Sequence, residues 1–415
     1  MKTFALLAGR VVTVDPARAT RDNPLGAIDD GGVLIDDGAI KLVAGRAEIV
    51  ARAAGAPVLA DEPHAVLTPG LCDAHTHAAF AGSRHSEYAA RLRGASYEDI
   101  ARAGGGILST RAAVKATSVA DLLRMLVQRL QRMASLGVTT VEVKSGYGLD
   151  GDNEQKQLDA IAQAAQRDDL PRVVATYLAL HAIPREDAAR RDAYVDAAIG
   201  RVATFSARGL MRYVDAYVDA QAFTVAEAER LGETARSAGL GIRLHVGQFA
   251  DVGGAALAAR LGAATADHLE NVAPSDVEAL ARAGTRAVLL PVASFTLGQA
   301  PPPVTLLRSA GVPLVVASDA NPGTAPTESL PLALALAVRL YGLHPEEALA
   351  GATREAAHSL GLGHRVGMMK EGFDADLALW DLPHEHAIVQ PWGTPKTKLV
   401  MRQGRVLAST RAPSA

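Results

Sequence analysis

The chain has 415 residues, of which 49% are hydrophobic and 21% are charged. This composition is typical of a globular protein with enough apolar material for a large core. The net charge is −3 and like charges form no long run, which argues against a nucleic-acid or membrane-surface partner. No stretch reaches the ~20 consecutive apolar residues that a membrane span needs.

Cysteine usage and the first residues both favour a cytoplasmic protein. Cys72 is the only cysteine, so a disulfide cannot form within the chain, as is usual in a reducing compartment. The apolar run at residues 4–7 ends at Gly9 and Arg10, before the hydrophobic region of a signal peptide would be complete. We expect these residues to form a first strand.

Both ends of the chain have the pattern of short strands separated by turns. In the first part the strand-like runs are residues 4–7, 11–14, 33–35 and 39–43, and in the last part they are residues 376–380 and 398–401. We expect residues 1–66 and 361–415 to form one small β-sandwich domain, with residues 67–360 between them. Two separate β domains are the alternative.

The middle of the chain alternates apolar strands with amphipathic helices. The clearest helix begins after Ser118, which can cap it, and runs to residue 133, with Gly137 suited to its exit. Eight segments are predicted to be strands: 70–75, 139–144, 173–180, 213–218, 242–246, 264–268, 287–292 and 314–318. This alternation indicates a parallel sheet covered by helices, and eight units favour an α/β fold of the (β/α)8 TIM-barrel type.

Reactive side chains follow the ends of several predicted strands. His75 and His77 end the first strand and, being two residues apart, point to the same side. His245 ends the fifth strand, His268 the sixth and Asp319 the eighth. A barrel gathers these ends around one mouth. Three histidines and a carboxylate suit one divalent or trivalent metal ion, zinc first and iron as the alternative.

Several motifs carry a resemblance to a known family. Residues 69–77, PGLCDAHTH, resemble the opening motif of the amidohydrolase superfamily. Seven further segments resemble the imidazolonepropionases, a family within that superfamily. They are FAGSR at 80–84, GASY at 94–97, AGGGI at 103–107, EVKSGYGL at 142–149, ADH at 266–268, SDANPG at 318–323 and GFDADL at 372–377. The resemblance runs almost end to end. It implies a metal-dependent hydrolase of histidine degradation that opens the ring of 4-imidazolone-5-propanoate to give N-formimidoyl-L-glutamate.

The resemblance also implies roles for individual residues. The metal ligands are expected to be His75, His77, His245 and Asp319. His268 is expected to polarise the ring carbonyl, and Asp319 to accept a proton from water. The substrate propionate is expected to contact Arg84, Tyr97 and Tyr147. The ring and product site is expected to include His181, Gln248, Asn321, Gly323 and Thr324.

One segment departs from the family pattern. Relatives usually carry an acid shortly after the third histidine, where this chain has Gly247 and Gln248. Neither residue can act as a base, so the proton transfer is expected to rest on Asp319. Glu270 is a candidate substitute, although an outward-facing helix position is the favoured interpretation. Lys144 ends the second strand, whereas some relatives with two metals carry a bridging lysine on the fourth, so one metal is favoured.

Two other functions remain open. The chain could be another amidohydrolase, a deaminase or cyclic-imide hydrolase acting on a carboxylate-bearing cyclic amide or amidine. Gln248 argues against an aromatic deaminase because it cannot protonate a ring nitrogen, and Arg84 favours an anionic substrate. The second alternative is a metal-binding barrel without catalysis. The expected partner is a small anionic cyclic amide. The apolar stretch at residues 331–338 is either a subunit interface or a barrel helix, so the sequence does not decide whether the chain forms a homodimer.

Overall fold

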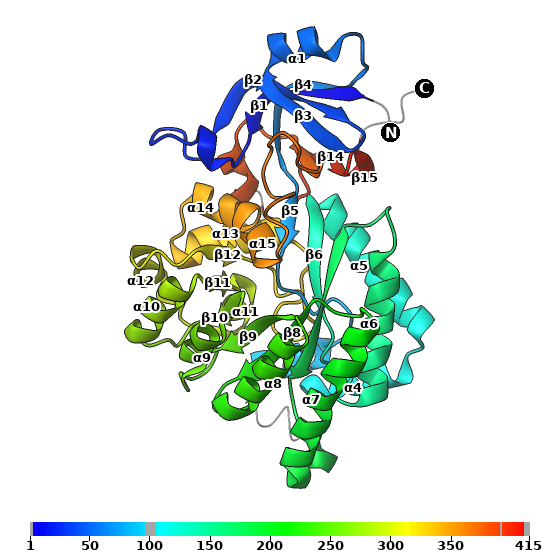
Figure 1. Ribbon diagram of the computed structural model, residues 1–415, viewed down its shortest axis with the longest axis vertical. Coiled ribbons are helices and arrows are strands. Elements are labelled where there is room, and N and C mark those ends of the chain that lie inside the picture. Colours follow the sequence, from blue (N-terminus) through cyan, green and yellow to red (C-terminus); the bar gives the residue numbers. More distant parts are fainter. Residues whose placement is uncertain (1–2, 96–104, 391, 411–415) are drawn as a thin grey trace.

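Two sheets organise the chain, one of seven strands and one of eight. A computed structural model describes residues 3–95, 105–390 and 392–410. Figure 1 shows the seven-stranded sheet at the top, with both termini beside it, and the eight-stranded sheet with its helices below. The metal-ligand candidates belong to the lower body.

The seven-stranded sheet is built from both ends of the chain. Its order is β15-β14-β13-β4-β1-β2-β3. The strands are β1 (Phe4–Val12), β2 (Ala27–Asp36), β3 (Ala39–Gly45), β4 (Val58–Pro69), β13 (Leu377–Trp380), β14 (Thr397–Arg402) and β15 (Arg405–Ser409). Antiparallel pairing of β4 with β13 joins the two parts, and apolar side chains from both, such as Leu67 and Leu379, share one core. The expected β domain from both termini is therefore present.

Gly9 does not interrupt the first strand. The sequence predicts two short strands on either side of Gly9, whereas β1 is continuous from Phe4 to Val12. A Cβ at Gly9 would lie 2.0 Å from the carbonyl oxygen of Pro63 on the neighbouring β4. The glycine is needed for this close approach of two backbones, which is one of the reasons that glycine occurs inside strands.

All eight predicted barrel strands are present. They are β5 (Leu71–Asp73), β6 (Val138–Lys144), β7 (Arg172–Leu180), β8 (Tyr213–Val218), β9 (Gly241–Val246), β10 (Thr265–His268), β11 (Arg286–Leu289) and β12 (Leu314–Val316). They pair in parallel in chain order, from β5 to β12. A parallel bridge between Thr76 and Ala320 joins the two edges just beyond β5 and β12. The sheet thus closes nearly completely, which confirms the TIM-barrel prediction.

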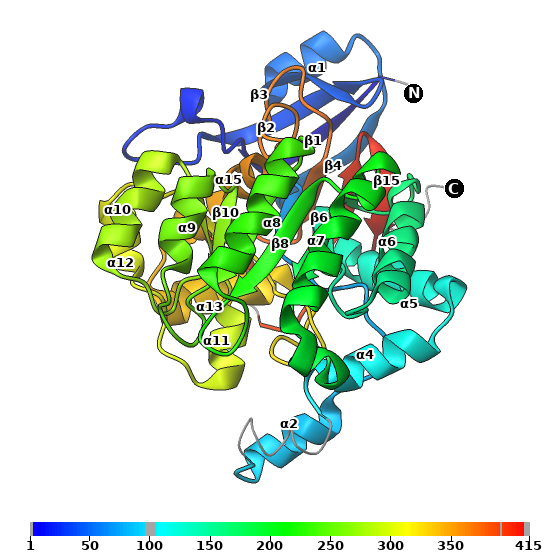
Figure 2. The same cartoon turned by 60° about the horizontal axis from the view of Figure 1, so that its bottom comes forward.

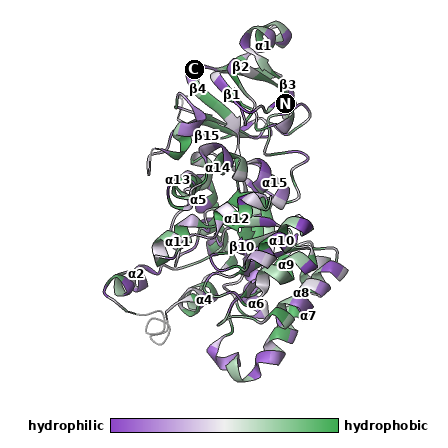
Figure 3. Ribbon diagram, turned by 90° about the vertical axis from the view of Figure 1, so that its left-hand side faces the viewer, coloured by the Kyte–Doolittle hydropathy of each residue, from purple (hydrophilic) through white to green (hydrophobic). Residues whose placement is uncertain are grey.

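Helices cover the outside of the barrel. Figure 2 shows α7 and α8 beside the strands, with α2 and α4 at the bottom of the view, and Figure 3 shows hydrophilic colouring on much of α7 and α8. Helix α1 (Arg46–Ala53) packs instead on the seven-stranded sheet. The other helices of the described residues are α2 (His85–Leu92), α4 (Ile107–Ala116), α5 (Val119–Ser135), α6 (Gly151–Ala165), α7 (Arg191–Ala207), α8 (Val225–Ser237), α9 (Gly254–Leu261), α10 (Pro274–Ala283), α11 (Pro291–Leu297), α12 (Val304–Ser309), α13 (Leu330–Tyr341), α14 (Pro345–Gly351) and α15 (Arg354–Ser359). Three 3-10 turns are η1 (Pro16–Arg18), η2 (Arg185–Arg190) and η3 (Glu385–Val389).

Helix α5 illustrates how the sequence places these elements. The Ser118 side chain accepts a hydrogen bond from the backbone N–H of Asp121 and so caps the first turn. Leu126 and Leu130 on one face are fully buried in the barrel core. Gly137, with φ 94°, then turns the chain into β6. Among the described residues, no helix combines the length and the apolar character that crossing a membrane requires.

Candidate metal centre

The closure of the barrel brings the expected metal ligands together. His75 and His77 follow β5, and Asp319 follows β12. The backbone N–H of Asp319 donates to the carbonyl of His75 over 3.1 Å, and that of His77 donates to Ala320 over 3.0 Å. His245 lies in β9, on the opposite part of the barrel. Residues far apart in the sequence therefore meet because the first and last strands are neighbours.

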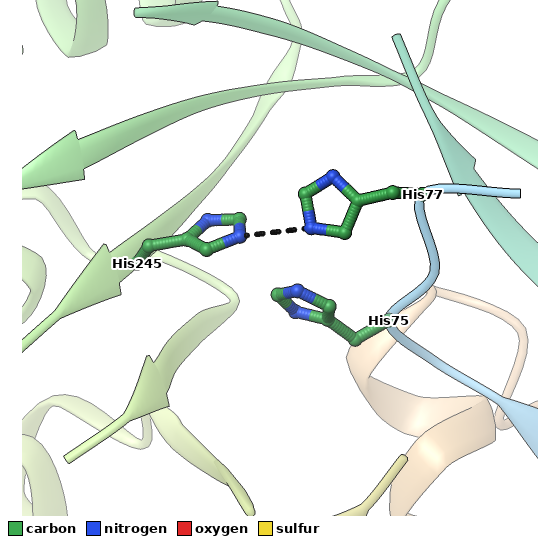
Figure 4. Close-up of side chains that lie close together, drawn as sticks. All are labelled: His75, His77 and His245. Atoms are coloured by element: carbon green, nitrogen blue, oxygen red, sulfur yellow. Dashed lines mark hydrogen bonds between the residues drawn. The ribbon is translucent and has the colours of Figure 1, made fainter. Parts of the chain in front are cut away.

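The ligand atoms surround a common point. His75 Nε2 is 3.6 Å and His77 Nε2 is 3.5 Å from Asp319 Oδ1. The Nε2 atoms of His77 and His245 are 3.4 Å apart, and Figure 4 shows the three rings converging. Ligand atoms about 2.0–2.1 Å from a tetrahedral zinc ion lie roughly 3.3 Å from one another. The separations therefore fit a single metal ion.

The protonation of the ring nitrogens supports the same conclusion. His75 Nδ1 lies 2.6 Å from Asp267 Oδ2, and His245 Nδ1 lies 3.0 Å from Asp215 Oδ1. A carboxylate accepts a hydrogen bond from the N–H of each Nδ1, so both Nε2 atoms of the neutral rings carry lone pairs. His75 Nε2 is buried and has no hydrogen-bond partner among the described residues. Lone pairs from several rings facing one another call for a cation between them.

Burial keeps two of these histidines neutral. It lowers the pKa of His75 well below its usual value, with Lys144 adding to the effect, and it also lowers the pKa of His77, with His181 adding to the effect. Neutral imidazole is the form that binds a metal. Burial raises the pKa of Asp319 to about 6. A bound cation would counteract this, because an adjacent positive charge favours the carboxylate.

A buried charge network lies beneath the ligands. Lys144 Nζ is 2.8 Å from both Glu142 and Asp215 and 4.0 Å from Asp267, and all four side chains are fully buried. Burial opposes the charge of Lys144, but Asp215 and Glu142 outweigh it and raise its pKa. Lys144 therefore joins the two carboxylates that hold His75 and His245. These salt bridges fit a structural role for Lys144 in the wall of the barrel.

The loop after β12 is shaped by Asn321. Its Oδ1 accepts hydrogen bonds from the backbone N–H groups of Gly323 and Thr324, and its Nδ2 donates to the carbonyl of Asp319 over 2.7 Å. The amide of Asn321 thus organises its own loop and holds the backbone of Asp319. A Cβ at Gly323 would lie 2.2 Å from a guanidinium nitrogen of Arg84. A side chain at this position would require the guanidinium group of Arg84 to move.

Arg84 is buried at the barrel mouth. Its side chain is 8% exposed and its Nε donates to Glu87 over 2.8 Å. It is also close enough to His181 to contribute to the lowering of that residue's pKa to about 4, of which burial is the main cause. A buried guanidinium at an active-site mouth suits an anionic ligand. Tyr97, the second residue expected to contact propionate, lies outside the described residues.

The aromatic rings of Tyr147 and His181 adjoin His77. The rings of His77 and His181 are stacked with centroids 5.4 Å apart, and the Tyr147 centroid is 5.3 Å from that of His181. His181 Nδ1 lies 2.7 Å from the carbonyl of Gly146 and must donate to it. A cavity of about 320 Å³ adjoins this side and is lined in part by His181, Tyr217 and Phe223. A larger cavity of about 600 Å³ lies between the barrel and the C-terminal segment; Ala320 and Asn321 line it, but none of the ligand candidates does.

The segment after His245 has no space for an acid at its second position, Gly247. Gly247 has φ 65°, and a Cβ there would lie 2.1 Å from the carbonyl oxygen of Asn271. Gln248 is buried, and its Oε1 accepts a hydrogen bond from the Tyr217 hydroxyl over 3.0 Å. The backbone conformation therefore requires glycine at position 247. The side-chain amide of Gln248 is held toward β8 by its hydrogen bond with Tyr217.

His268 and Glu270 lie together beside the ligand candidates. The His268 ring centroid is 5.6 Å from that of His245. Burial opposes protonation of His268, but the nearby Glu270 outweighs it and raises the pKa of the imidazole. Glu270 is not the outward-facing helix residue favoured from the sequence. It precedes α10, and its side chain is only 3% exposed, with its Oε2 3.6 Å from His268 Nδ1.

The structure thus brings most of the expected site residues to one barrel mouth. Sequence reasoning missed the acids Glu142, Asp215 and Asp267. Asp267 and Asp215 accept hydrogen bonds from the ligand candidates His75 and His245, and Glu142 pairs with Lys144. A signal was available for Asp215, which interrupts the otherwise apolar strand β8, whereas the strands of Glu142 and Asp267 carry other polar residues. A buried acid in such a position must be paired.

Comparisons with known proteins agree with this geometry. The amidohydrolase family model matches residues 66–407. The imidazolonepropionase of Shewanella loihica is 42% identical over 399 residues, covering 96% of this chain and 97% of the relative. The imidazolonepropionase of Idiomarina loihiensis is 42% identical over 403 residues, covering 95% and 96%.

The chain belongs to the imidazolonepropionases of the amidohydrolase family.

Solved structures show the same fold at lower identity. A triazine hydrolase variant has a TM-score of 0.77 at 17% identity, covering 99% of this chain and 95% of that one. Guanine deaminase from C. acetobutylicum has a TM-score of 0.74 at 14% identity, covering 98% and 100%. An adenosine deaminase from Xanthomonas campestris with bound zinc has a TM-score of 0.67 at 20% identity, covering 97% and 92%. At these identities the likeness concerns the fold alone.

Proposed function

We propose that this chain is a metal-dependent hydrolase that opens the ring of 4-imidazolone-5-propanoate to give N-formimidoyl-L-glutamate, a step of histidine degradation. The observation that carries the proposal is the meeting of His75, His77, His245 and Asp319 at one barrel mouth in a chain whose relatives at 42% identity are imidazolonepropionases. The buried Arg84 supports a substrate with a carboxylate.

The proposed metal is a single zinc ion, with iron as the alternative. When bound, the ion supplies Lewis acidity and lowers the pKa of a water molecule to about 7. The three imidazoles and one carboxylate suit this ion class. Zinc is favoured because a neighbour of the same fold, the Xanthomonas deaminase, is described with bound zinc.

Individual residues of the chain have separate roles in the proposed reaction. Asp319 accepts the proton that water loses as it attacks the ring carbonyl, and it returns that proton to the ring nitrogen when the ring C–N bond breaks. His268 donates a hydrogen bond to the carbonyl oxygen, where negative charge develops before the ring C–N bond breaks. Asp267 and Asp215 keep the rings of His75 and His245 in the orientation that presents Nε2.

Substrate binding is assigned to the surrounding side chains. Arg84, together with Tyr97 and Tyr147, holds the propionate, because a guanidinium and hydroxyl groups donate to a carboxylate. The ring lies beside His181 and Gln248, on the side where the 320 Å³ cavity opens. Asn321, Gly323 and Thr324 complete the site through the loop that supports Arg84. The expectations of a homodimer, a cytoplasmic location and no nucleic-acid or membrane partner stay predictions.

A second candidate function is hydrolysis of another cyclic amide or amidine that bears a carboxylate. The observation that favours it is Gly247: a side chain there would collide with Asn271, so the acid that relatives usually carry in this segment cannot be placed at Gly247. An aromatic deaminase fits poorly, because it needs an acid to protonate a nitrogen of the aromatic ring and the amide of Gln248 cannot do so.

The test uses purified protein of known metal content and fresh 4-imidazolone-5-propanoate. Loss of the ring's ultraviolet absorbance is followed, and N-formimidoylglutamate is identified by mass spectrometry. Ring opening that a chelator abolishes and zinc restores supports the proposal. Metal-loaded protein that leaves this substrate intact but opens another carboxylate-bearing cyclic amide would move the assignment to the second candidate.

A further inference from the structure

A buried acid stands behind His268, in a chain that lacks the acid expected after His245. Glu270 is 3% exposed in its side chain, as is His268. The chain reaches this arrangement through two left-handed residues that are not glycine, His268 with φ 79° and Leu269 with φ 67°. Each such residue costs about 1–2 kcal/mol, and strain of this kind concentrates at functional sites.

Glu270 is held from one side and open to His268 on the other. Its Oε1 accepts a hydrogen bond from the Ser294 hydroxyl over 2.6 Å, and Ser294 is itself 2.5 Å from the Tyr341 hydroxyl. Its Oε2 and His268 Nδ1 are both buried, and neither has a hydrogen-bond partner among the described residues. The two atoms are 3.6 Å apart and are each other's candidate partner.

The 3.6 Å separation is somewhat longer than a hydrogen bond. Catalytic hydrogen bonds are often loose before substrate binds and tighten in the complex. A carboxylate facing Nδ1 requires a proton on that nitrogen, because a lone pair there would face a negative charge. The ring then has a fixed orientation, with Nε2 directed away from Glu270.

We propose that Glu270, anchored by Ser294, is a positioning residue that orients His268 through its Nδ1–H so that Nε2 serves the ring carbonyl. The inference rests on the proposed function and adds a residue to it. Glu270 touches neither substrate nor metal, and no proton leaves the histidine in this role. The carboxylate works through the imidazole, as an aspartate does behind the histidine of a serine protease triad.

A double-mutant cycle tests this inference. Glu270→Gln should lower kcat about 10- to 100-fold and leave KM within about twofold, the range found when the group that orients a site histidine is removed. In a His268→Gln background the same change should alter kcat less than about twofold. Ser294→Ala should give a smaller loss that disappears when Glu270→Gln is present. Equal losses of kcat in both backgrounds would show that Glu270 acts independently of His268.

A matched control is Glu347→Gln, a partly exposed glutamate that pairs with Arg308 far from the site. It should leave kcat within about twofold. Metal content and the urea unfolding midpoint of each variant identify any that fail to fold, and Ser294→Ala then carries the test because it leaves the carboxylate intact.

A spectroscopic readout separates this inference from the proposed function. In zinc-loaded protein labelled with 15N-histidine, the His268 Nδ1–H should give a downfield proton signal, assigned by its loss in His268→Gln. Glu270→Gln should shift that signal upfield. A signal unchanged by Glu270→Gln overturns the pairing even if the wild type opens the imidazolone ring. Absence of ring opening with the expected shift refutes the proposed substrate and leaves the pairing supported.

Discussion

Replacing Lys144 with methionine should destabilise the barrel strongly. The ammonium group is 2.8 Å from carboxylates of both Glu142 and Asp215. At an effective dielectric constant of about 20, each contact contributes about 6 kcal/mol of gross attraction. Most of that offsets the cost of burying the charges, and removing one partner of such a pair typically costs about 3–5 kcal/mol. We therefore expect Lys144→Met to lower the free energy of unfolding by about 3–5 kcal/mol.

The assay is urea unfolding of metal-free protein, so that metal binding does not add to the measured stability. Lys156→Met is the matched control, because its ammonium donates to the Lys115 carbonyl in an exposed position. That control should change stability by less than about 0.5 kcal/mol. A loss below about 1 kcal/mol for Lys144→Met would refute the reasoning, since it would mean that the three carboxylates near it do not depend on this cation.

Three further predictions concern the site and its loops. Asp319→Asn should keep the fold and reduce kcat at least about 1,000-fold, because it removes a charged ligand and the proton acceptor; circular dichroism and steady-state kinetics check this, and retention of a tenth of the activity would exclude the role. Arg84→Ala should raise KM about 10- to 100-fold with little change in kcat, and an unchanged KM would remove Arg84 from the carboxylate site. Gly247→Ala should cost more stability than Gly239→Ala, since both have positive φ but only the first meets a backbone oxygen, at 2.1 Å; equal urea midpoints would contradict the clash.

The barrel could be predicted because its strands are unusually apolar and its helices amphipathic. Strand β8 begins and ends at the predicted residues, 213 and 218. The histidines could be placed because strand ends converge in any parallel barrel. The pairing of His75 with Asp267 could not be predicted, because it joins residues 192 positions apart and depends on the register of separate strands.

Two errors have a common origin in backbone geometry. Gly9 was expected to end a strand, yet it permits one, because the Pro63 carbonyl fills the space of its side chain. Glu270 was expected on an outer helix face, yet left-handed φ at His268 and Leu269 turns it inward. Histidine and leucine give no sequence signal of positive φ, unlike glycine.

The construction of the β domain from both termini has a consequence for synthesis of the protein. Strand β4 pairs with β1 on one side and with β13 on the other. Roughly 300 residues separate β4 from β13, and at about 5–20 residues per second the ribosome needs some 15–60 s to make them. During that time one edge of β4 has no strand to pair with. The first 69 residues of the nascent chain therefore depend on chaperones or on the growing barrel to avoid edge-to-edge aggregation. Release of truncated chains would expose that edge permanently.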